Sequence, residues 1–563
     1  MSPEGKTSRG MPLRRRVLLG EGLRLAAAMG GTTLLAACGH AAPAAPQRSA
    51  APSQKGATFR LGATILPSQL SNYNPFQQTG NWAQIFDYLY DQLFYFSPVD
   101  GKLLHRLGTG YKWNGAGTQL TVALHPGARW HDGKAVTAAD VVFTYQALKQ
   151  YPALDTYALW QNLAGVSAPT AGEVVFSLHK PFPSLPAYLS TVYIVPQHVW
   201  SAQNPTQYLN NPPAVGSGPF VFDHYTPGTD ILLRANAHYF LGAPRIGYLD
   251  ILMYANTSAA SLAMLRGSVD TPGDGIAMPS LPQMLKIPGV QYQHYPALSN
   301  GVVYMNNGRP PLNAAPVRRA ISATINRAAL IAANEGASFA GNPGWVPTAF
   351  GAACDQALVA DPQYGYDPKA AAGFLAQAGF HKGADGKLAG PDGQPLTLTY
   401  YAPASMAAQD KIASIIEQGI AALGITLTPR LATPPELTNL LRSGQYDLLQ
   451  SGANFPPDPQ ETLFAYFGSG ESAPEGQNTV GLNYARYSNP QVDALLAQSA
   501  TTLDTQARNK IFFQVQQIIA AEAPVAVMYE AAGHTPYNTK AFQGYRTDVP
   551  VTSAFSLMNV RAI

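Results

Sequence analysis

Short apolar segments, most of them alternating with polar residues, predict several strands along the chain. Such segments lie at 58–62, 220–222, 231–233, 249–252, 397–401 and 425–427. Apolar residues recur at helical spacing over 82–96, 369–380, 407–423 and 506–521. The helix at 407–423 lies between two of the strands, and Gly424 is well placed to end it. This strand–helix–strand order predicts an α/β fold, and no internal repeat is visible.

One further helix start is predicted close to a turn. Asp132-Gly133 is a turn signal, and Thr137 with Asp140 forms a variant of the capping box. A helix should therefore begin after Thr137, with Val141 and Phe143 on its buried face. His131 and Asp132 could suggest a charge relay, but no nucleophile lies beside them, so we interpret the pair as structural.

The N-terminal residues have the composition of an export signal. Arg14, Arg15 and Arg16 precede a mostly apolar run that ends at Ala37, directly before Cys38. The uncharged part of this run is too short to span a bilayer. We therefore predict an export signal at 1–37. The following residues, rich in Ala, Pro, Ser and Gln, predict a flexible tether over 38–57.

Charge is scarce in this chain of 563 residues. Only 12% are Asp, Glu, Lys or Arg, although 46% are hydrophobic, and the net charge is +3. The predicted signal holds six basic and two acidic residues, so the remainder has 30 basic and 31 acidic residues, a net charge of −1. High hydrophobicity with low net charge excludes intrinsic disorder. The absence of excess positive charge also argues against binding to nucleic acid.

Signatures of enzyme and metal sites are missing from the sequence. Cys354 is the only cysteine besides Cys38, so an internal disulfide is not expected within the exported part. The eleven histidines form no HExxH pattern, and no P-loop, GxGxxG or GxSxG motif occurs. We predict no catalytic residue, no metal site and no cofactor.

Several segments resemble one known family. The stretch from Leu124 to Phe143 resembles its signature, and further similarities follow in the same order along the chain. They lie at Tyr90–Phe94, Gly216–Phe220, Asn236–Pro244, Pro316–Ile321 and Asn489–Asp493, with Arg508 in a late helix. The family is that of the bacterial ABC-importer solute-binding proteins, family 5, which includes oligopeptide-, dipeptide- and nickel-binding periplasmic proteins. The similarity covers roughly residues 58–563.

This resemblance implies an α/β, two-lobed periplasmic-binding-protein fold of type II, similar to cluster C, with an extra small domain inserted in the first lobe. The expected first lobe comprises 58–98, 200–298 and 525–563. The extra domain would cover 99–199, and the second lobe 299–524.

The implied function is an extracytoplasmic receptor of an ABC importer, and not an enzyme. A peptide or peptide-like solute would bind as the lobes close and would then pass to a membrane permease. The protein is expected to be a monomer at the outer face of the cytoplasmic membrane or in the periplasm. Leu35–Cys38 resembles a lipobox, so Cys38 would carry a lipid anchor, while Arg15-Arg16 and the residues after it resemble a twin-arginine signal; Sec export remains the alternative.

The resemblance also places a ligand-binding segment at 450–459. In peptide-binding members, an acid in this segment pairs with the α-ammonium of the peptide, next to an aromatic residue. By position, Asn454 replaces that acid and Phe455 the aromatic residue, with Ser451, Gly452 and Ala453 beside them. We expect these five residues to line the cleft. Tyr73, Asn74 and Trp345 are further candidates for ligand contact.

The missing acid matters for the ligand. A buried ammonium without its carboxylate costs on the order of 3–5 kcal/mol. Either Asp458 supplies the charge instead, or the ligand has no free amine there. We favour a ligand that is not a simple di- or tripeptide with a free amine. The alternatives are a sugar, an opine-like compound or a metal chelate in the same fold, or, in another class, a secreted hydrolase.

Overall fold

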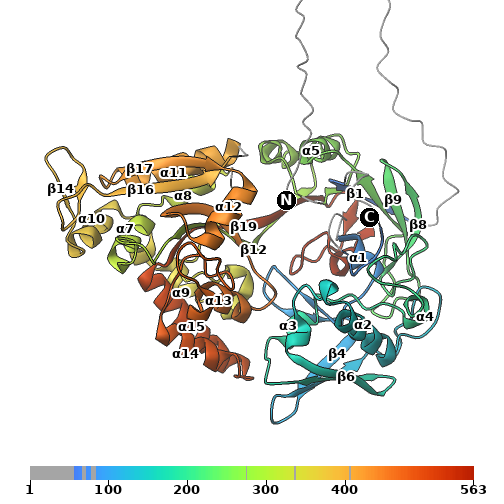
Figure 1. Ribbon diagram of the computed structural model, residues 1–563. Coiled ribbons are helices and arrows are strands. Elements are labelled where there is room, and N and C mark those ends of the chain that lie inside the picture. Colours follow the sequence, from blue (N-terminus) through green and yellow to red (C-terminus); the bar gives the residue numbers. More distant parts are fainter. Residues whose placement is uncertain are drawn as a thin grey trace, which may run out of the picture. The chain divides into compact units, whose positions relative to one another are not determined.

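The computed structural model describes residues 56–65, 72–77, 84–273, 275–334, 336, 338–404 and 407–563. The predicted export signal, Cys38 and most of the predicted tether lie outside these residues. None of the helices within the described residues is long and apolar enough to cross a membrane. Figure 1 shows the arrangement of the elements.

A five-stranded sheet has the order β11-β1-β10-β9-β8. Its strands are β1 (Thr58–Ala63), β8 (Phe220–Thr226), β9 (Asp230–Ala235), β10 (Tyr248–Met253) and β11 (Thr271–Pro272). The sequence predicted a strand at β1, β8, β9 and β10, and the structure confirms all four. Phe59 and Leu61 pack in one buried cluster with Leu233 and Ile251 from the neighbouring strands. Nearby helices are α1 (Gln84–Leu89), α4 (Gln197–Trp200) and α5 (Thr257–Leu265).

A four-stranded antiparallel sheet with the order β4-β5-β7-β6 is built from residues 108–178. Its strands are β4 (Gly108–Trp113), β5 (Gln119–Leu124), β6 (Leu163–Thr170) and β7 (Glu173–Leu178). Helix α2 (Ala138–Gln150) begins after Thr137, as predicted, and the backbone N–H of Thr137 donates to the Asp140 carboxylate at 2.8 Å. Val141 and Tyr145 of α2 pack against Leu120 and Phe176 of the sheet.

The predicted helix over 82–96 is wrong in its second half. Helix α1 ends at Leu89, and residues 94–96 form strand β2 (Phe94–Phe96), paired with β3 (Leu103–His105). Between them Asp91 is fully buried, and its carboxylate accepts hydrogen bonds from Ser217 Oγ at 2.9 Å and Tyr239 Oη at 2.8 Å. These tertiary contacts hold the chain in an extended form that the apolar spacing did not indicate.

His131 joins two of the sequence motifs. Its Nε2 lies 3.1 Å from the carbonyl of Gly218, and its Nδ1 accepts from the Gly216 N–H at 3.2 Å. Because a carbonyl can only accept, the proton of the neutral ring is on Nε2. Gly216 itself passes so close to the backbone of α1 that a Cβ there would lie 1.8 Å from the Leu89 carbonyl oxygen. The ring therefore has a structural role, as the sequence analysis proposed.

This arrangement predicts a pH-dependent contribution to stability. Burial lowers the pKa of His131 from 6.5 to about 4. A lowered pKa means that the neutral ring stabilises the fold above pH 6.5, and that this stability is lost as the pH falls towards 4. We expect the advantage of the wild type over His131→Phe in unfolding free energy to shrink by about 2–3 kcal/mol between pH 7 and 4. Urea titrations at each pH measure it, with the exposed His381→Phe as control. An advantage that does not change with pH would contradict this role.

The largest sheet has six strands in the order β13-β19-β12-β18-β16-β17. Its strands are β12 (Val290–Met305), β13 (Ser338–Ala340), β16 (Thr397–Pro403), β17 (Thr426–Ala432), β18 (Leu448–Asn454) and β19 (Val525–Asn538). Strands β16 and β17 pair in parallel on either side of α11 (Ala407–Ala421), which confirms the predicted strand–helix–strand unit. Val303 and Met305 face one buried cluster and Val302 and Tyr304 the other, so the sheet is buried on both faces.

Helices flank both faces of the six-stranded sheet. Two of them, α10 and α15, were predicted at 369–380 and 506–521. The helices are α7 (Ala315–Ala323), α8 (Arg327–Ala333), α9 (Gln356–Ala360), α10 (Pro368–Gln377), α12 (Pro434–Ser443), α13 (Pro459–Phe467), α14 (Pro490–Ser499) and α15 (Thr505–Glu522). Asn326 caps α8 by accepting a hydrogen bond from the Ala329 N–H at 2.9 Å.

The paired strands β12 and β19 are long, and β12 packs in different buried clusters along its length. Strands β12 and β19 pair from Val290↔Asn538 to Pro296↔Ala532, where the register shifts, and resume at Asn300↔Glu530. Before the shift, Val290 and Tyr292 pack against the cluster around Met264 and Met284. After it, Val302–Met305 and Val525–Met528 pack in the clusters of the six-stranded sheet. Residues Val525–Met528 of β19 thus pack with the six-stranded sheet, and the residues of β12 before the shift pack in a separate cluster. We call 296–300 and 530–532 the strand crossover.

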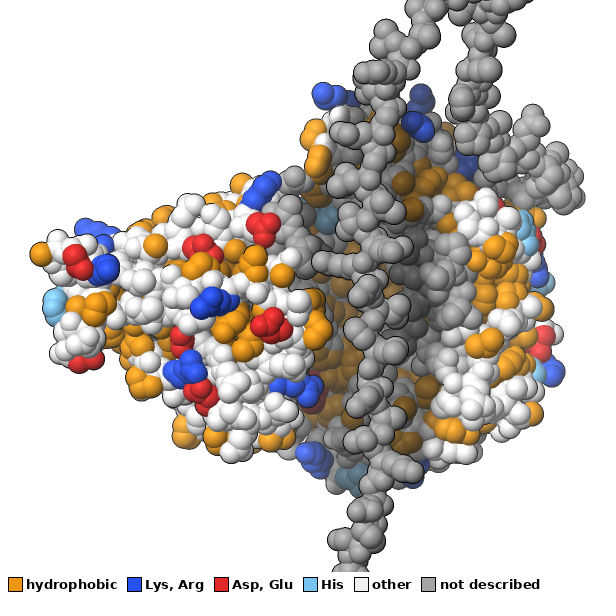
Figure 2. Space-filling view, turned by 45° about the horizontal axis from the view of Figure 1, so that its top comes forward, with side chains coloured by type: hydrophobic (Ala, Val, Ile, Leu, Met, Phe, Trp, Pro, Cys, Tyr) orange, Lys and Arg blue, Asp and Glu red, His pale blue; other side chains and the backbone are white. Residues whose placement is uncertain are grey.

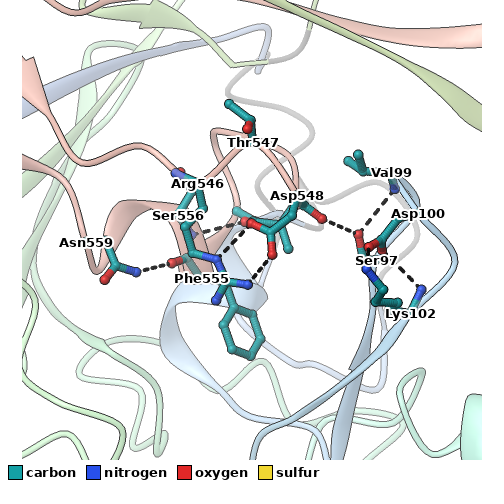
Figure 3. A network of polar contacts seen from close by, with 12 residues as sticks. Ser97, Val99, Asp100, Lys102, Arg546, Thr547, Asp548, Phe555, Ser556 and Asn559 are labelled. Carbon is teal, nitrogen blue, oxygen red and sulfur yellow. Dashed lines mark hydrogen bonds and ion pairs between the residues drawn. The ribbon is translucent and has the colours of Figure 1, made fainter.

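The C-terminal segment folds back onto the residues that lead to β3. Figure 3 shows Ser97 Oγ donating to the carbonyl of Asp548 at 2.8 Å and Arg546 paired with the Asp548 carboxylate at 2.5 Å. The backbone N–H of Arg546 donates to Ser556 Oγ at 3.1 Å. These contacts fix the loop 549–553, which follows Asp548.

Charged side chains are sparse on the face shown in Figure 2. Basic and acidic side chains are scattered and interspersed there, with no broad patch of one sign. On this face, therefore, no charge of one sign is concentrated.

Candidate functional site

Three cavities of about 920, 520 and 450 Å³ share walls. Tyr157 lines all three, Tyr193 the first two, and Phe455 the last two. The middle cavity reaches the strand crossover, because Tyr295 and Leu298 also line it, together with Pro550, Thr552 and Ser553 from the C-terminal loop. We call the three together the cleft. Its walls come from segments that are far apart in the sequence and that meet near the strand crossover.

The cleft is lined mainly by aromatic rings and neutral hydrogen-bonding groups. The rings are Phe76, Tyr95, Phe96, Tyr157, Phe182, Tyr188, Tyr193, Tyr295, Phe455 and Tyr466; the neutral polar groups include Asn72, Gln77, Gln84, Gln92, Gln161, Asn162, Ser190, Thr191 and Asn454. Pockets that orient small ligands have this composition.

The segment 450–455 is a strand for most of its length. Residues 451–454 belong to β18, which pairs with β12 through Ser299↔Asn454 and Val302↔Ser451. Strand alternation buries Ala453 in the core and leaves Gly452 and Asn454 exposed, with Ser451 partly buried. Of the five predicted residues, the structure brings Asn454 and Phe455 to the cleft; Ser451, Gly452 and Ala453 do not line it.

The three remaining candidates lie behind the cleft surface. Tyr73 is buried with its ring against Phe222, at 5.6 Å between centroids. Asn74 is fully buried, and its amide donates to the carbonyls of Pro205 at 2.7 Å and Tyr208 at 2.8 Å. Trp345 is also fully buried, with its ring centroid 4.8 Å from that of Tyr466. In this structure none of the three lines the cleft, because packing or hydrogen bonding already occupies each side chain.

Asp458 is already paired within the protein. Its carboxylate accepts two hydrogen bonds from the Arg508 guanidinium, each 2.8 Å long, and one from the Gln460 N–H at 2.9 Å. Arg508 Nη2 also donates to Ser184 Oγ at 2.8 Å. Asp458 does not line the cleft, and its charge is balanced by Arg508. The structure therefore does not favour the hypothesis that Asp458 supplies the charge missing at Asn454.

The charges of the cleft are all negative. Among the described residues that line it there is no Lys, Arg or His; the charged ones are Asp87, Asp155 and Glu461. Asp87 pairs with Arg106 at 2.8 Å. Asp155 accepts the backbone N–H groups of Leu159 and Trp160, both at 2.9 Å. For Glu461, no described residue donates a hydrogen bond to its carboxylate or forms an ion pair with it.

Sequence reasoning missed most of the lining residues. Tyr157 lies just before β6, and Ser190–Tyr193 lie between β7 and α4. They carry no motif, because a tyrosine that lines a cavity has the same local pattern as one in a core. Glu461 lies three residues after Asp458, so only its proximity to the predicted segment could have suggested it. The described residues contain no group of three or more His, Cys, Asp or Glu side chains arranged to hold a metal ion.

Comparison with known proteins identifies the family. Residues 102–474 match the family model described as bacterial extracellular solute-binding proteins, family 5 middle. The chain is 23% identical over 452 residues to the oligopeptide-binding protein AppA of Bacillus subtilis, covering 76% of this chain and 78% of AppA.

Solved structures share the fold. A periplasmic oligopeptide-binding protein of Thermotoga maritima superposes with a TM-score of 0.76 at 21% identity, covering 90% of this chain and 99% of the other. A second structure of that protein, with mannohexaose bound, gives 0.66 at 22% identity, with the same coverage. NikZ of Campylobacter jejuni, in complex with Ni(L-His), gives 0.67 at 20% identity and covers 89% of this chain and 99% of its own. The fold is thus the two-lobed α/β fold implied by the sequence resemblance, and the chain belongs to the bacterial extracellular solute-binding proteins of family 5.

Proposed function

We propose that the chain is the extracytoplasmic receptor of an ABC importer, which captures a peptide or peptide-like solute by lobe closure and delivers it to a membrane permease. The observation that carries this proposal is the cleft at the strand crossover, lined from both sides by aromatic and neutral polar groups. A solute that contacts both sides would favour a closed form, because its binding energy differs between the open and closed states. No catalytic role is proposed.

The proposed lobes follow the buried clusters. The first lobe contains the five-stranded sheet, the extra domain the four-stranded sheet, and the second lobe the six-stranded sheet. Residues 1–37 as export signal, Cys38 as lipid anchor, 38–57 as tether and a monomeric state remain parts of the proposal drawn from the sequence.

A non-peptide solute is the second candidate. The described lining has no cationic residue to meet the terminal carboxylate of a short peptide. Relatives of the same fold were solved with mannohexaose and with Ni(L-His), which supports a neutral sugar or a metal chelate as alternatives.

The proposal predicts solute-dependent compaction. Native mass spectrometry of the protein purified without its signal should reveal a copurifying solute. Mild denaturant should then release this solute from the protein. Adding the identified solute back should lower the radius of gyration in small-angle scattering without consuming the solute. Solute turnover would favour the hydrolase alternative. Binding with no change in the radius of gyration would contradict lobe closure.

A further inference from the structure

The 450 Å³ cavity combines aromatic walls with the carboxylate of Glu461, to which no described residue donates a hydrogen bond and with which none forms an ion pair. We propose that this cavity is a subsite for a cationic nitrogen group of the solute, an ammonium, alkylated ammonium or guanidinium, with Glu461 as its counter-ion. The inference rests on the proposed function and specifies one chemical feature of the solute.

The aromatic walls come from two parts of the chain. Tyr157, Phe182 and Tyr188 line one part of the cavity, and Phe455 and Tyr466 another. Tyr188 holds its two neighbours together, with ring centroids 5.5 Å from Tyr157 and 5.7 Å from Phe182. Cations bind favourably over the faces of such rings, and cages of several rings recognise alkylated ammonium groups.

Glu461 supplies a negative charge that no described residue pairs with directly. It lies in the first turn of α13 and is partly buried. Burial raises its pKa, and nearby Asp458 acts in the same direction, while the charges of Arg508 and Lys180 oppose the shift. Arg508 is a buried cation close enough to lower that pKa, but both of its terminal nitrogens bind Asp458. Lys180 is exposed and forms no ion pair with Glu461. The Asp458–Arg508 pair is neutral, so Glu461 leaves the cavity with a net negative charge that a cation would balance.

The same cavity contains Asn454, the position where the family resemblance expects an acid. The side-chain oxygen of Asn454 can accept a hydrogen bond from an ammonium or guanidinium, but it carries no charge. Glu461 thus adds a third alternative to the two considered from the sequence: the charge missing at Asn454 is supplied from the next helix. A solute with a carboxylate at this subsite would be repelled.

Calorimetry with matched probes tests the subsite. The probes are tetra-alanine amide with a free amine, its N-trimethylated form and its neutral N-acetylated form, with mannohexaose as a neutral solute without a peptide backbone. Each is titrated into the wild type, Glu461→Gln and a control, Glu173→Gln, which removes a carboxylate of β7 that is not part of the cavity lining. All three proteins are first freed of copurified solute.

We expect the wild type to bind at least one cationic probe more tightly than the N-acetylated one. Glu461→Gln should weaken the binding of that cationic probe by roughly 10- to 100-fold and leave neutral probes unchanged. Glu173→Gln should behave as the wild type. The two cationic probes separate a hydrogen-bonded primary ammonium from a group held by the rings alone.

The outcomes distinguish the subsite from the receptor function. If probes bind irrespective of charge, or if Glu461→Gln binds the cationic probes as the wild type does, the cationic subsite is wrong while the receptor function stands. If no probe binds and no solute copurifies, both proposals are wrong.

Discussion

Replacing Arg508 by methionine should lower the free energy of unfolding by about 3–5 kcal/mol, because it leaves the Asp458 carboxylate buried without its partner. Both residues are 7% exposed, and two hydrogen bonds of 2.8 Å join their side chains. Arg508 also donates to Ser184, which belongs to the segment before α3 (Leu185–Tyr188). The substitution therefore also removes a link between α15 and the segment of the chain that contains Phe182 and Tyr188.

Two further variants identify the cause of this loss. Combining Arg508→Met with Asp458→Asn removes the unpaired charge and should recover at least half of the lost stability, since a buried pair replaced as a whole often costs little. Arg546→Met breaks the exposed pair with Asp548 shown in Figure 3, and it should cost less than about 1 kcal/mol. Urea denaturation measures all three. A double variant no more stable than Arg508→Met would show that the charge pair is not the cause.

Local pattern predicted those elements whose apolar face also determines their packing. The alternation in β16 and the spacing in α11 were sufficient, because each buries one consistent set of side chains in the core. The capping box at Thr137 fixed the start of α2 through contacts within four residues of the chain. Where a distant partner decides, as Ser217 and Tyr239 do at Asp91, the local pattern predicted a helix and the structure has an extended segment.

The candidate site was less accessible to sequence reasoning than the fold. Residue 454 could be placed by resemblance, but strand pairing in β18 determines which of its neighbours face the cleft. The rings at Tyr157 and Tyr188 reach the cleft only through the folding of the four-stranded part of the chain. The pairing of Asp458 could not be predicted either, because its partner Arg508 is 50 residues away in the sequence.

Trp345 was expected to contact the ligand, but it packs behind aromatic residues that line the cleft. The ring contacts Phe455, Tyr466 and Phe467 at centroid distances of 5.6, 4.8 and 5.1 Å. Its carbonyl accepts from Asn300 Nδ2 at 2.7 Å, at the strand crossover. The loop is held there by Glu530 as well, which accepts from the N–H of Thr348 at 3.0 Å. Trp345 thus supports two of the rings that line the cleft.

Replacing Trp345 by alanine should therefore destabilise the protein by about 3–5 kcal/mol, since it empties a fully buried aromatic site. The backbone at residue 345 has φ of 81°, which alanine also tolerates poorly, so the loss reflects packing and not relief of strain. Trp345→Phe keeps one aromatic ring, so its loss of stability should be at most half of the loss caused by Trp345→Ala. Urea denaturation and calorimetry of the same variants separate the two roles. If Trp345→Ala weakens solute binding while costing less than about 1 kcal/mol of stability, Trp345 contacts the solute directly, as the sequence analysis expected, and the supporting role is wrong.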